Sequence, residues 1–346
     1  MIVAVNLVGL KAGCGGGAEH YIRNVLATMR AVQPDTRFVL ITCPDNHDSF
    51  EGWDRECLSG AGLFAGMESR VERAARQRNA DVLFAPLESA PVKSSMPVVV
   101  FALDLYAWEE DAEESARKRA ARIKTVKRVC ENAAAIVAPS GFVQRKYLEL
   151  LGIPLNKVVV APLGVSDVFA KPQTCFIQKP YFLVVGATRV YRNLKRLREV
   201  FDILKDDFPH GLVVVGQPAE AEPPDWGPRV MRIESCPAAH LAGLYQHCDV
   251  FIQPSLYEGS GVTVLEAMRS GAPVVTSRTG GIAEVAGDTP IYFNPESTHS
   301  IIAGIRWALD EQPEQRQARV RYGRQAASEY TWERCAWKTL SAFKRS

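Results

Sequence analysis

Short apolar runs alternate with helix-period stretches along this 346-residue chain, and this alternation restricts its fold more than any other feature. Runs such as Val82 to Ala85 and Ala135 to Ala138 are continuously apolar. That pattern is typical of strands buried on both faces of a sheet. The helical stretches between them provide the crossovers that parallel strands need. The chain is therefore predicted to be an α/β protein built on parallel sheets.

The alternation occurs twice. The predicted strands of the first half are Ile2–Leu7, Arg37–Thr42, Val82–Ala85, Pro97–Ala102, Ala135–Ala138 and Lys157–Ala161. Those of the second half are Tyr181–Val185, Leu212–Val215, Val230–Ile233, Val250–Gln253 and Val274–Thr276. The predicted helices include Ala18–Met29, Glu109–Cys130, Phe142–Leu151, Lys195–Leu204 and Ala239–His247. A weakly periodic stretch, Ser166 to Lys179, separates the halves, and the length suits two domains.

Composition excludes several functional classes. A net charge of +2 lacks the basic excess of a nucleic-acid-binding protein. The eight cysteines form no C-x-x-C pair, which favours free thiols in a reducing cytosol over a zinc site or a disulfide framework. No apolar run reaches the length of a membrane span, and the apolar N-terminus lacks a basic leader region. We therefore expect a cytoplasmic protein with at most peripheral membrane contact.

The strongest chemical signal is a pair of carboxylates, Glu258 and Glu266, on either side of a glycine-rich turn. The turn leads into a helical stretch from Val262 to Ser270. The N-terminus of a helix presents free N–H groups and a positive dipole end, which favour phosphate or a polarised oxygen. The two carboxylates can accept hydrogen bonds from two sets of sugar hydroxyls. Together these features suit a nucleotide-sugar.

The same stretch resembles a known family. Glu258 and Glu266, followed by EAM, GAPVV and GGIAEV, resemble the signature of GT4-type retaining glycosyltransferases of the GT-B fold, which include bacterial mannosyl- and glucosyltransferases. The resemblance implies two Rossmann-like domains facing across a central cleft. It places an acceptor-side domain at 1–168, a donor-binding domain at 169–328, and a C-terminal helix at 329–346 that crosses back to the first domain. The terminal sequence WERCAWKTLSAFK suits that helix.

The resemblance also assigns residues of the donor site. Glu266 would hold the ribose, and Glu258 would hold the transferred sugar as a catalytic residue. The turn residues implied to bind the donor beside Glu258 are Gly259, Ser260, Gly261 and Val262. Ser260 replaces an aromatic residue that is common in the family, which implies a more open pocket wall.

A second loop, GATRVYRNLKRL, follows the strand Tyr181–Val185 and resembles the family's donor phosphate loop. Here Gly186, Arg192 and Asn193 are implied to bind the donor, and Arg192 stands where the phosphate-binding lysine would be. A guanidinium at that position would neutralise the diphosphate and stabilise the leaving group, which makes Arg192 a predicted catalytic residue. The alternative is a solvated arginine at the start of a helix.

The N-terminal loop GCGGGAEHY allows more than one interpretation. Gly13, Gly15 and Ala18 formally match the G-x-G-x-x-A fingerprint of dinucleotide-binding proteins. However, the loop lies several residues beyond its strand, and no acidic residue follows about twenty residues later, where that fingerprint requires one. The resemblance instead places Gly15, Gly16 and Gly17 against the donor phosphate. A plain turn is the third option.

Two further features concern the acceptor side. In FALDLYAW the resemblance implies that Asp104 orients an acceptor hydroxyl, although an aspartate here also suits a turn cap. Leu103 replaces the family's histidine, which leaves the sugar and the level of activity open. Arg117 to Arg128 is basic without an interrupting acid, after an acidic stretch from Glu109 to Glu114. This order either complements a helix dipole or provides a surface for anionic lipids or a lipid-diphosphate acceptor.

We therefore predict a retaining hexosyltransferase. It would move a mannose- or glucose-type sugar from a GDP- or UDP-sugar to a saccharide or lipid-linked acceptor, in surface polysaccharide or lipopolysaccharide assembly. No cofactor and no metal are expected, since the chain has neither Asp-x-Asp nor a helical histidine pair. One alternative is a weak or inactive nucleotide-sugar-binding protein. It is motivated by three departures from the family's pattern: Leu103 in place of the histidine, Ala187 in place of an arginine that some members carry, and Ser166 in place of the usual aspartate. Another is an NAD-dependent oxidoreductase, based on the first glycine loop.

Overall fold

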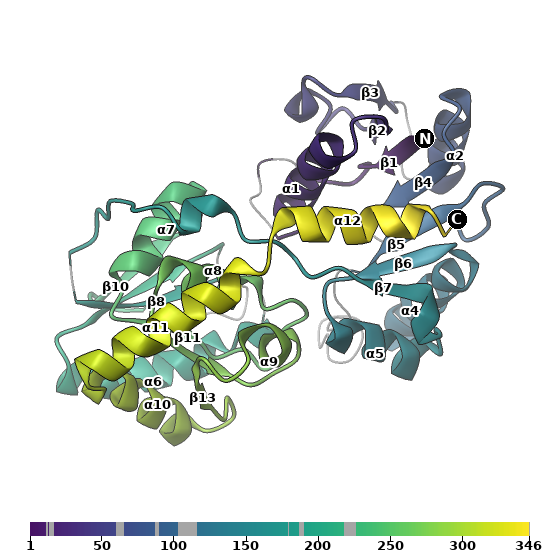
Figure 1. The fold of residues 1–346 in the computed structure, drawn as a ribbon. Helices are drawn as coiled ribbons and strands as arrows, with labels where there is room; N and C mark the ends of the chain where they lie inside the picture. The colour runs from purple at the N-terminus through teal and green to yellow at the C-terminus, as the bar shows by residue number, and fades with distance from the viewer. Residues whose placement is uncertain are drawn as a thin grey trace. The chain divides into compact units, whose positions relative to one another are not determined.

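The computed structural model describes residues 1–11, 13, 17–59, 66–86, 90–102, 116–178, 180–186, 190–217 and 226–345. The chain divides into two compact units (Figure 1). Unit 1 comprises Met1–Leu163 and Trp332–Ser346, and unit 2 comprises Gly164–Thr331. The expected boundaries, after residues 168 and 328, differ from these divisions by a few residues.

Unit 1 contains a seven-stranded sheet with the order β3-β2-β1-β4-β5-β6-β7. Every neighbouring pair is parallel. The strands are β1 Ile2–Asn6, β2 Arg37–Thr42, β3 Asp54–Cys57, β4 Val82–Ala85, β5 Val98–Phe101, β6 Ala135–Ala138 and β7 Val158–Val160. The strand order reverses between β1 and β4, as in doubly wound folds, whose ligands bind at the carboxyl ends of the strands.

Helices cover both faces of this sheet because successive strand residues point to opposite sides. Val3 and Val5 belong to one buried cluster, with α1 and α12, whereas Ala4 belongs to another, with α2, α4 and α5. The helices of unit 1 are α1 Gly17–Val32, α2 Met67–Gln77, α4 Ala116–Asn132, α5 Gly141–Leu151 and α12 Trp332–Phe343. The short 3-10 turns are η1 Asp48–Phe50 and η2 Leu155–Lys157.

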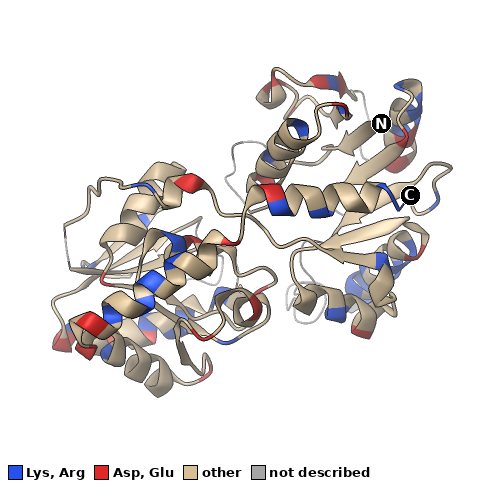
Figure 2. Cartoon of the chain, in the orientation of Figure 1, with Lys and Arg blue, Asp and Glu red and all other residues tan. Residues whose placement is uncertain are grey.

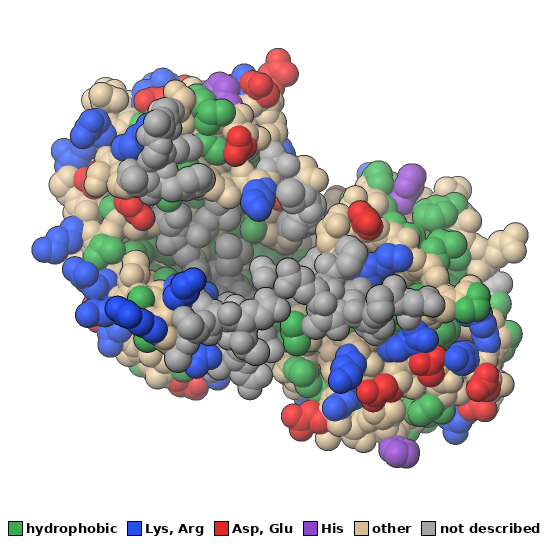
Figure 3. Space-filling view, turned by 180° about the vertical axis from the view of Figure 1, so that it is seen from behind, with side chains coloured by type: hydrophobic (Ala, Val, Ile, Leu, Met, Phe, Trp, Pro, Cys, Tyr) green, Lys and Arg blue, Asp and Glu red, His purple; other side chains and the backbone are tan. Residues whose placement is uncertain are grey.

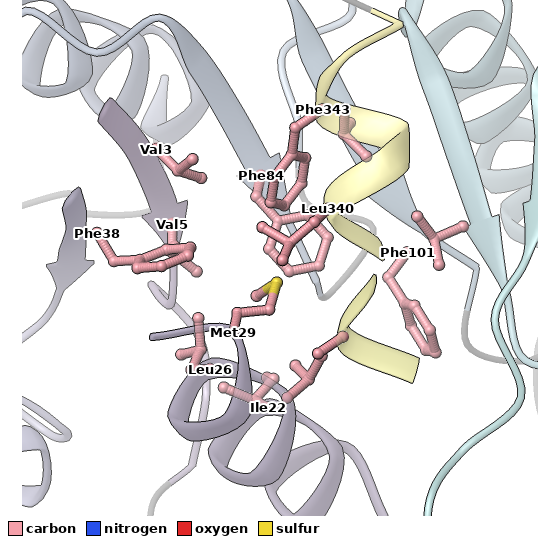
Figure 4. Close-up of a cluster of buried hydrophobic side chains, with 14 of the residues drawn as sticks. Val3, Val5, Ile22, Leu26, Met29, Phe38, Phe84, Phe101, Leu340 and Phe343 are labelled. Carbon is pink, nitrogen blue, oxygen red and sulfur yellow. The ribbon is translucent and has the colours of Figure 1, made fainter. Parts of the chain in front are cut away.

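The last helix, α12, is part of the core of unit 1. Leu340 and Phe343 of α12 lie among the side chains of β1, β4 and α1 (Figure 4). The rings of Phe343 and Phe84 meet edge to face with centroids 5.3 Å apart. The prediction that the C-terminal helix returns to the first domain is confirmed.

Unit 2 contains a six-stranded parallel sheet with the order β10-β9-β8-β11-β12-β13. The strands are β8 Tyr181–Val185, β9 Gly211–Val215, β10 Val230–Ile233, β11 Val250–Gln253, β12 Val274–Ser277 and β13 Ile291–Phe293. The helices are α6 Leu194–Asp207, α7 Ala238–His247, α8 Val262–Ser270, α9 Gly281–Ala286, α10 Thr298–Asp310 and α11 Pro313–Ser328, with 3-10 turns η3 Asp167–Phe169 and η4 Val190–Arg192. Two parallel α/β units confirm the predicted fold class.

The two faces of this sheet are also covered. The helices α6 and α10 pack on one face, and α7, α8, α9 and α11 pack on the other. Strands β3 and β13 were not predicted, because β3 is a polar edge strand (DREC) and β13 has only three residues. No helix among the described residues is both long and apolar enough to cross a membrane.

Candidate functional site

The candidate site of unit 2 lies at the carboxyl ends of two neighbouring strands, β8 and β11. Gly186 follows β8 directly, and Gln253 is the last residue of β11. Because parallel strands end at the same edge of a sheet, the loops after them lie together. These two loops carry the residues of the phosphate-loop sequence and of the glycine-rich turn.

Arg192, at the end of η4, forms an ion pair with Glu258. The side chains are 15% and 7% exposed, so the pair is largely shielded from water. Arg192 Nη1 also lies 3.5 Å from Ser255 Oγ. Gly186 has a φ of +86°, and a Cβ added there would lie 3.4 Å from the guanidinium. Arg192 is therefore enclosed by this site, and its interpretation as a solvated residue is wrong.

Gln253 also contacts Glu258, from the end of β11. Its Nε2 donates a hydrogen bond of 3.0 Å to Glu258 Oε2, the oxygen that pairs with Arg192. The backbone oxygen of Glu258 accepts a 2.7 Å hydrogen bond from the amide of Gly281, at the start of α9. Glu258 is thus held by both its side chain and its backbone.

The glycine-rich turn is packed tightly against the start of α9. A Cβ on Gly261 would come within 2.7 Å of Val285 Cγ2, and a Cβ on Gly281 would come within 2.5 Å of the oxygen of Gly259. Gly261 also has a φ of +71°, where glycine is favoured. It precedes α8, whose first N–H groups lack intrahelical acceptors. The site therefore combines a buried carboxylate, a guanidinium and a helix N-terminus.

Asn193 joins several segments of the site. It has a left-handed φ of +60° at the start of α6. Its Nδ2 donates to the backbone oxygens of Pro254, at 3.1 Å, and Pro295, at 2.8 Å. Both amide protons are thus used to hold the loops after β11 and β13 against α6. These hydrogen bonds give Asn193 a structural role next to Arg192. Its contact with the donor stays a prediction.

Glu266 lies on α8 in an apolar environment. Burial raises its pKa to about 8, and a hydrogen bond from the Tyr245 hydroxyl, at 3.5 Å, opposes this only in part. Burial, reinforced by the nearby Glu266, raises the pKa of Tyr245 well above its ordinary value. The neutral form of the Glu266 carboxyl group is therefore favoured in the unliganded protein. A neighbouring pair of hydroxyl donors would favour its ionised form.

Most of the other residues predicted from the sequence belong to unit 1 or lie outside the described residues. Gly17 is the first residue of α1, while Gly15, Gly16, Leu103, Asp104 and Ala187 lie outside the described residues. The N-terminal loop is tied to α1 by Glu19, whose carboxylate accepts hydrogen bonds of 3.0 and 3.2 Å from the amide of Gly13. Within the part of the chain that the structure describes, no cluster of His, Cys, Asp or Glu could hold a metal ion.

A separate basic surface lies on α4 of unit 1 (Figure 2). Among the described residues of this helix, the only acidic side chain is Glu131, which lies 3.9 Å from Lys127. Lysine and arginine side chains gather on this part of unit 1 in the opposite view (Figure 3). The exposed cations of α4 are Arg117, Lys118, Lys124, Lys127 and Arg128. This surface belongs to a different unit from the candidate site.

The sequence alone did not single out Gln253, Ser255, Tyr245 or Glu19. Gln253 ends a predicted strand, and its position as a polar residue after an apolar run is the one signal that could have marked it. Tyr245 lies inside a predicted helix and is fully buried. Their roles depend on which segments meet in space.

Comparisons with known proteins identify a family domain in each part of the chain. The model of Glycosyltransferase Family 4 matches residues 15–168, and that of Glycosyl transferases group 1 matches residues 169–326. The O-antigen chain mannosyltransferase B of Escherichia coli is 27% identical over 64% of this chain and 63% of its own length. A glycogen synthase of Mycobacterium tuberculosis is 34% identical over 30% of this chain and 25% of its own length. The alignments span less than two thirds of these relatives.

Solved structures are similar over nearly the whole chain. Sucrose-phosphate synthase from Thermosynechococcus elongatus superposes with a TM-score of 0.75 at 17% identity, covering 99% of this chain and 98% of its own. The HepE protein of Anabaena, in complex with UDP and glucose, gives a TM-score of 0.76 at 16% identity, covering 99% of both chains. At these identities the likeness establishes the fold.

Proposed function

Because the chain belongs to the GT4-type family of GT-B glycosyltransferases, we propose that it transfers a hexose with retention from a GDP- or UDP-sugar to a saccharide or lipid-linked acceptor. The family models favour this reaction over dinucleotide-dependent oxidation. The mannosyltransferase among the relatives supports GDP-mannose as the first donor to test. The UDP complex of HepE supports UDP-sugars as the second.

The observation that carries the proposal is the shielded pair of Arg192 and Glu258 at the start of α8. When a donor binds, its diphosphate competes with Glu258 for the guanidinium. Arg192 then neutralises the charge that develops on the leaving diphosphate, and Glu258 accepts a hydrogen bond from a sugar hydroxyl. Without a ligand, the charges of the two residues neutralise each other. With the donor bound, Arg192 binds the diphosphate and Glu258 binds the sugar.

Glu266 is proposed to bind the ribose. Burial raises its pKa to about 8, and the hydrogen bond with Tyr245 lowers it only in part. Hydrogen bonds from two ribose hydroxyls would favour the ionised form and lower the pKa again, so binding of the nucleotide would release a proton near pH 7.

The proposed chemical step needs no protein nucleophile. The bond between the anomeric carbon and the diphosphate oxygen breaks, and a bond to the acceptor oxygen forms on the same face of the sugar. The acceptor hydroxyl proton passes to the departing diphosphate. Arg192 and the first N–H groups of α8 stabilise this departing charge, so positioning and electrostatics account for the catalysis without a metal.

The basic surface of α4 is proposed to contact the anionic cytoplasmic face of a membrane. A cytoplasmic enzyme would reach a lipid-linked acceptor there. The neighbouring segment α5–η2 exposes three leucines: Leu148 is 42%, Leu150 40% and Leu155 43% exposed. Cations beside exposed apolar side chains are typical of peripheral contact with anionic lipids. Assembly of a surface polysaccharide or lipopolysaccharide is the setting that this proposal implies.

The test begins with ligand binding. The thermal midpoint should rise with GDP or UDP, since a ligand that binds the folded state stabilises it. Transfer should follow with one donor of a GDP- and UDP-sugar panel, with and without EDTA. NMR of the product should show the anomeric configuration of the donor. Nucleotide binding without turnover of any donor would support the weak or inactive alternative, and an inverted product would contradict retention.

A further inference from the structure

Gln253 is a buried polar side chain whose carboxamide forms hydrogen bonds through both its nitrogen and its oxygen inside the candidate site. It is 1% exposed at the end of β11. Its Nε2 donates to Glu258 Oε2 at 3.0 Å and to Ser255 Oγ at 3.2 Å, and its Oε1 accepts from Thr263 Oγ1 at 3.0 Å. This buried amide joins Ser255 and Glu258, in the loop after β11, to Thr263 in the first turn of α8.

The chemistry of the partners fixes the orientation of this amide. A rotated carboxamide would place Oε1 against the carboxylate of Glu258, where two acceptors repel each other. It would also place Nε2 where Thr263 now donates. Since the carboxylate can only accept when ionised, Gln253 must be the donor. Thr263 therefore contributes to the orientation of Gln253 through its hydroxyl group.

The two oxygens of Glu258 have different environments. Oε2 accepts hydrogen bonds from both Arg192 and Gln253. Among the described residues, no hydrogen bond reaches Oε1. One oxygen is anchored by two donors, and the other is left for a hydroxyl group of the donor sugar.

The two donors also differ in charge. Arg192 is a cation that a diphosphate can attract away from Glu258, whereas the neutral amide of Gln253 offers no comparable attraction. We propose, on the basis of the proposed function, that Gln253 is a positioning residue that keeps the Glu258 carboxylate in place for the donor sugar while Arg192 binds the diphosphate. Gln253 acts through Glu258 and does not itself contact the reacting atoms.

The test compares Gln253→Met with Thr276→Val. Met is of similar length and lacks the donor, so Glu258 loses its neutral partner. Thr276 is fully buried, and its hydroxyl donates to the backbone oxygens of Gln253, at 3.1 Å, and Ser277, at 3.3 Å. Gln253→Met loses its hydrogen bonds with Glu258, Ser255 and Thr263, whereas Thr276→Val loses hydrogen bonds to backbone oxygens. Both variants therefore lose buried hydrogen bonds, but only the first removes a partner of Glu258.

For Gln253→Met we expect kcat to fall about tenfold to a hundredfold, the size of a hydrogen bond to a charged group. The Kd for the nucleoside diphosphate alone should stay within about twofold, because the sugar is absent from that ligand. Thr276→Val should keep its kcat even if its stability falls. Thr263→Val, a half-buried position with little risk to folding, should lower kcat in the same direction but by less.

Unchanged kcat in Gln253→Met would overturn the proposal. So would an equal loss of diphosphate binding and turnover, or a matching loss of kcat in Thr276→Val, since these indicate general loosening. If the wild type turns over no donor, the proposed function is wrong, but this result alone does not contradict the role of Gln253. The positioning role is then tested by binding: the wild type should bind the nucleotide-sugar more tightly than the diphosphate, and Gln253→Met should lose that difference. No such difference in the wild type would overturn it.

Discussion

The two units use charged side chains in opposite ways. In unit 2, Arg192 and Glu258 are enclosed together at the ends of β8 and β11. In unit 1, the cations of α4 are mostly exposed, and the described helix carries one acidic residue. An enclosed ion pair depends strongly on both partners, because removing one leaves an uncompensated buried charge. Exposed charges contribute little to stability and are free to meet a partner of opposite charge.

The largest effect should come from Arg192→Met. It should lower kcat on the order of a hundredfold or more, since a key electrostatic contact is lost. It should also destabilise the protein by about 3–5 kcal/mol, because Glu258 remains buried without its cation. Denaturant unfolding and single-donor kinetics measure the two effects.

Two controls sharpen this prediction. Arg192→Met combined with Glu258→Gln should recover much of the stability but none of the activity, because the uncompensated charge is gone. Arg306→Ala removes an exposed ion pair with Asp207 elsewhere in unit 2 and should change neither property appreciably. If the double variant stays as unstable as the single one, the enclosed-pair account of unit 2 is wrong.

The next effect concerns Glu266→Gln. Burial raises the pKa of Glu266 from 4.5 to about 8, so between these pH values the folded protein keeps a proton that the unfolded chain releases. The stability that the neutral carboxyl group contributes is therefore full below pH 4.5 and falls until the pH passes about 8. The glutamine variant stays neutral throughout. Its stability relative to the wild type should therefore grow between these pH values, as measured by urea unfolding from pH 5 to 8.5.

The same variant should bind the nucleotide less tightly, by about tenfold, because an amide is a weaker acceptor than a carboxylate for the ribose. Calorimetry of the wild type in buffers of different ionisation enthalpy should show proton release on binding near pH 7. Equal affinity in the variant and the wild type would remove Glu266 from the ribose site.

A smaller effect is expected for Gly186→Ala. The φ of +86° is unfavourable for alanine, and the strain costs about 1–2 kcal/mol. The new methyl group would also contact the guanidinium of Arg192. A several-fold fall in kcat with a modest fall in stability should result. Gly152→Ala, at a helix end in unit 1 with a φ of +70°, provides a strain control that should leave kcat unchanged.

The smallest effect on turnover is expected for the combined change of Lys118, Lys124 and Lys127 to Gln. With a soluble acceptor, kcat should stay within about twofold, because exposed charges on α4 contribute little to the fold. Sedimentation with phosphatidylglycerol vesicles should fall by about tenfold or more, and added salt should weaken binding by the wild type. Equal vesicle binding by both proteins would contradict the membrane proposal.

Much of the fold was predictable because local patterns report on burial. The strands Arg37–Thr42 and Tyr181–Val185 have the same bounds in the prediction and in the structure. Continuous apolar runs identify strands that are buried on both faces. The pattern was missing in β3, which has a polar sequence at the sheet edge, and in β13, which is short.

The site was only partly predictable. Its motifs predicted Arg192, Glu258 and Glu266 as candidate residues, because glycine turns and charged residues near strand ends are visible in a sequence. Gln253 was not identified, since a glutamine at the end of a strand has no meaning until Glu258 and Thr263 lie next to it. The glycines of the turn were expected to approach a ligand, whereas Gly261 also packs against α9.

By itself, the sequence determined most of the secondary structure, the parallel sheets and the residue types at the candidate site, because hydrophobic periodicity and turn chemistry act over a few neighbouring residues. Only the tertiary structure decided that α12 completes the core of unit 1, that Arg192 is enclosed with Glu258, and that one carboxylate oxygen has two donors. These facts depend on contacts between residues far apart in the chain, whose burial and hydrogen bonds exist only after packing.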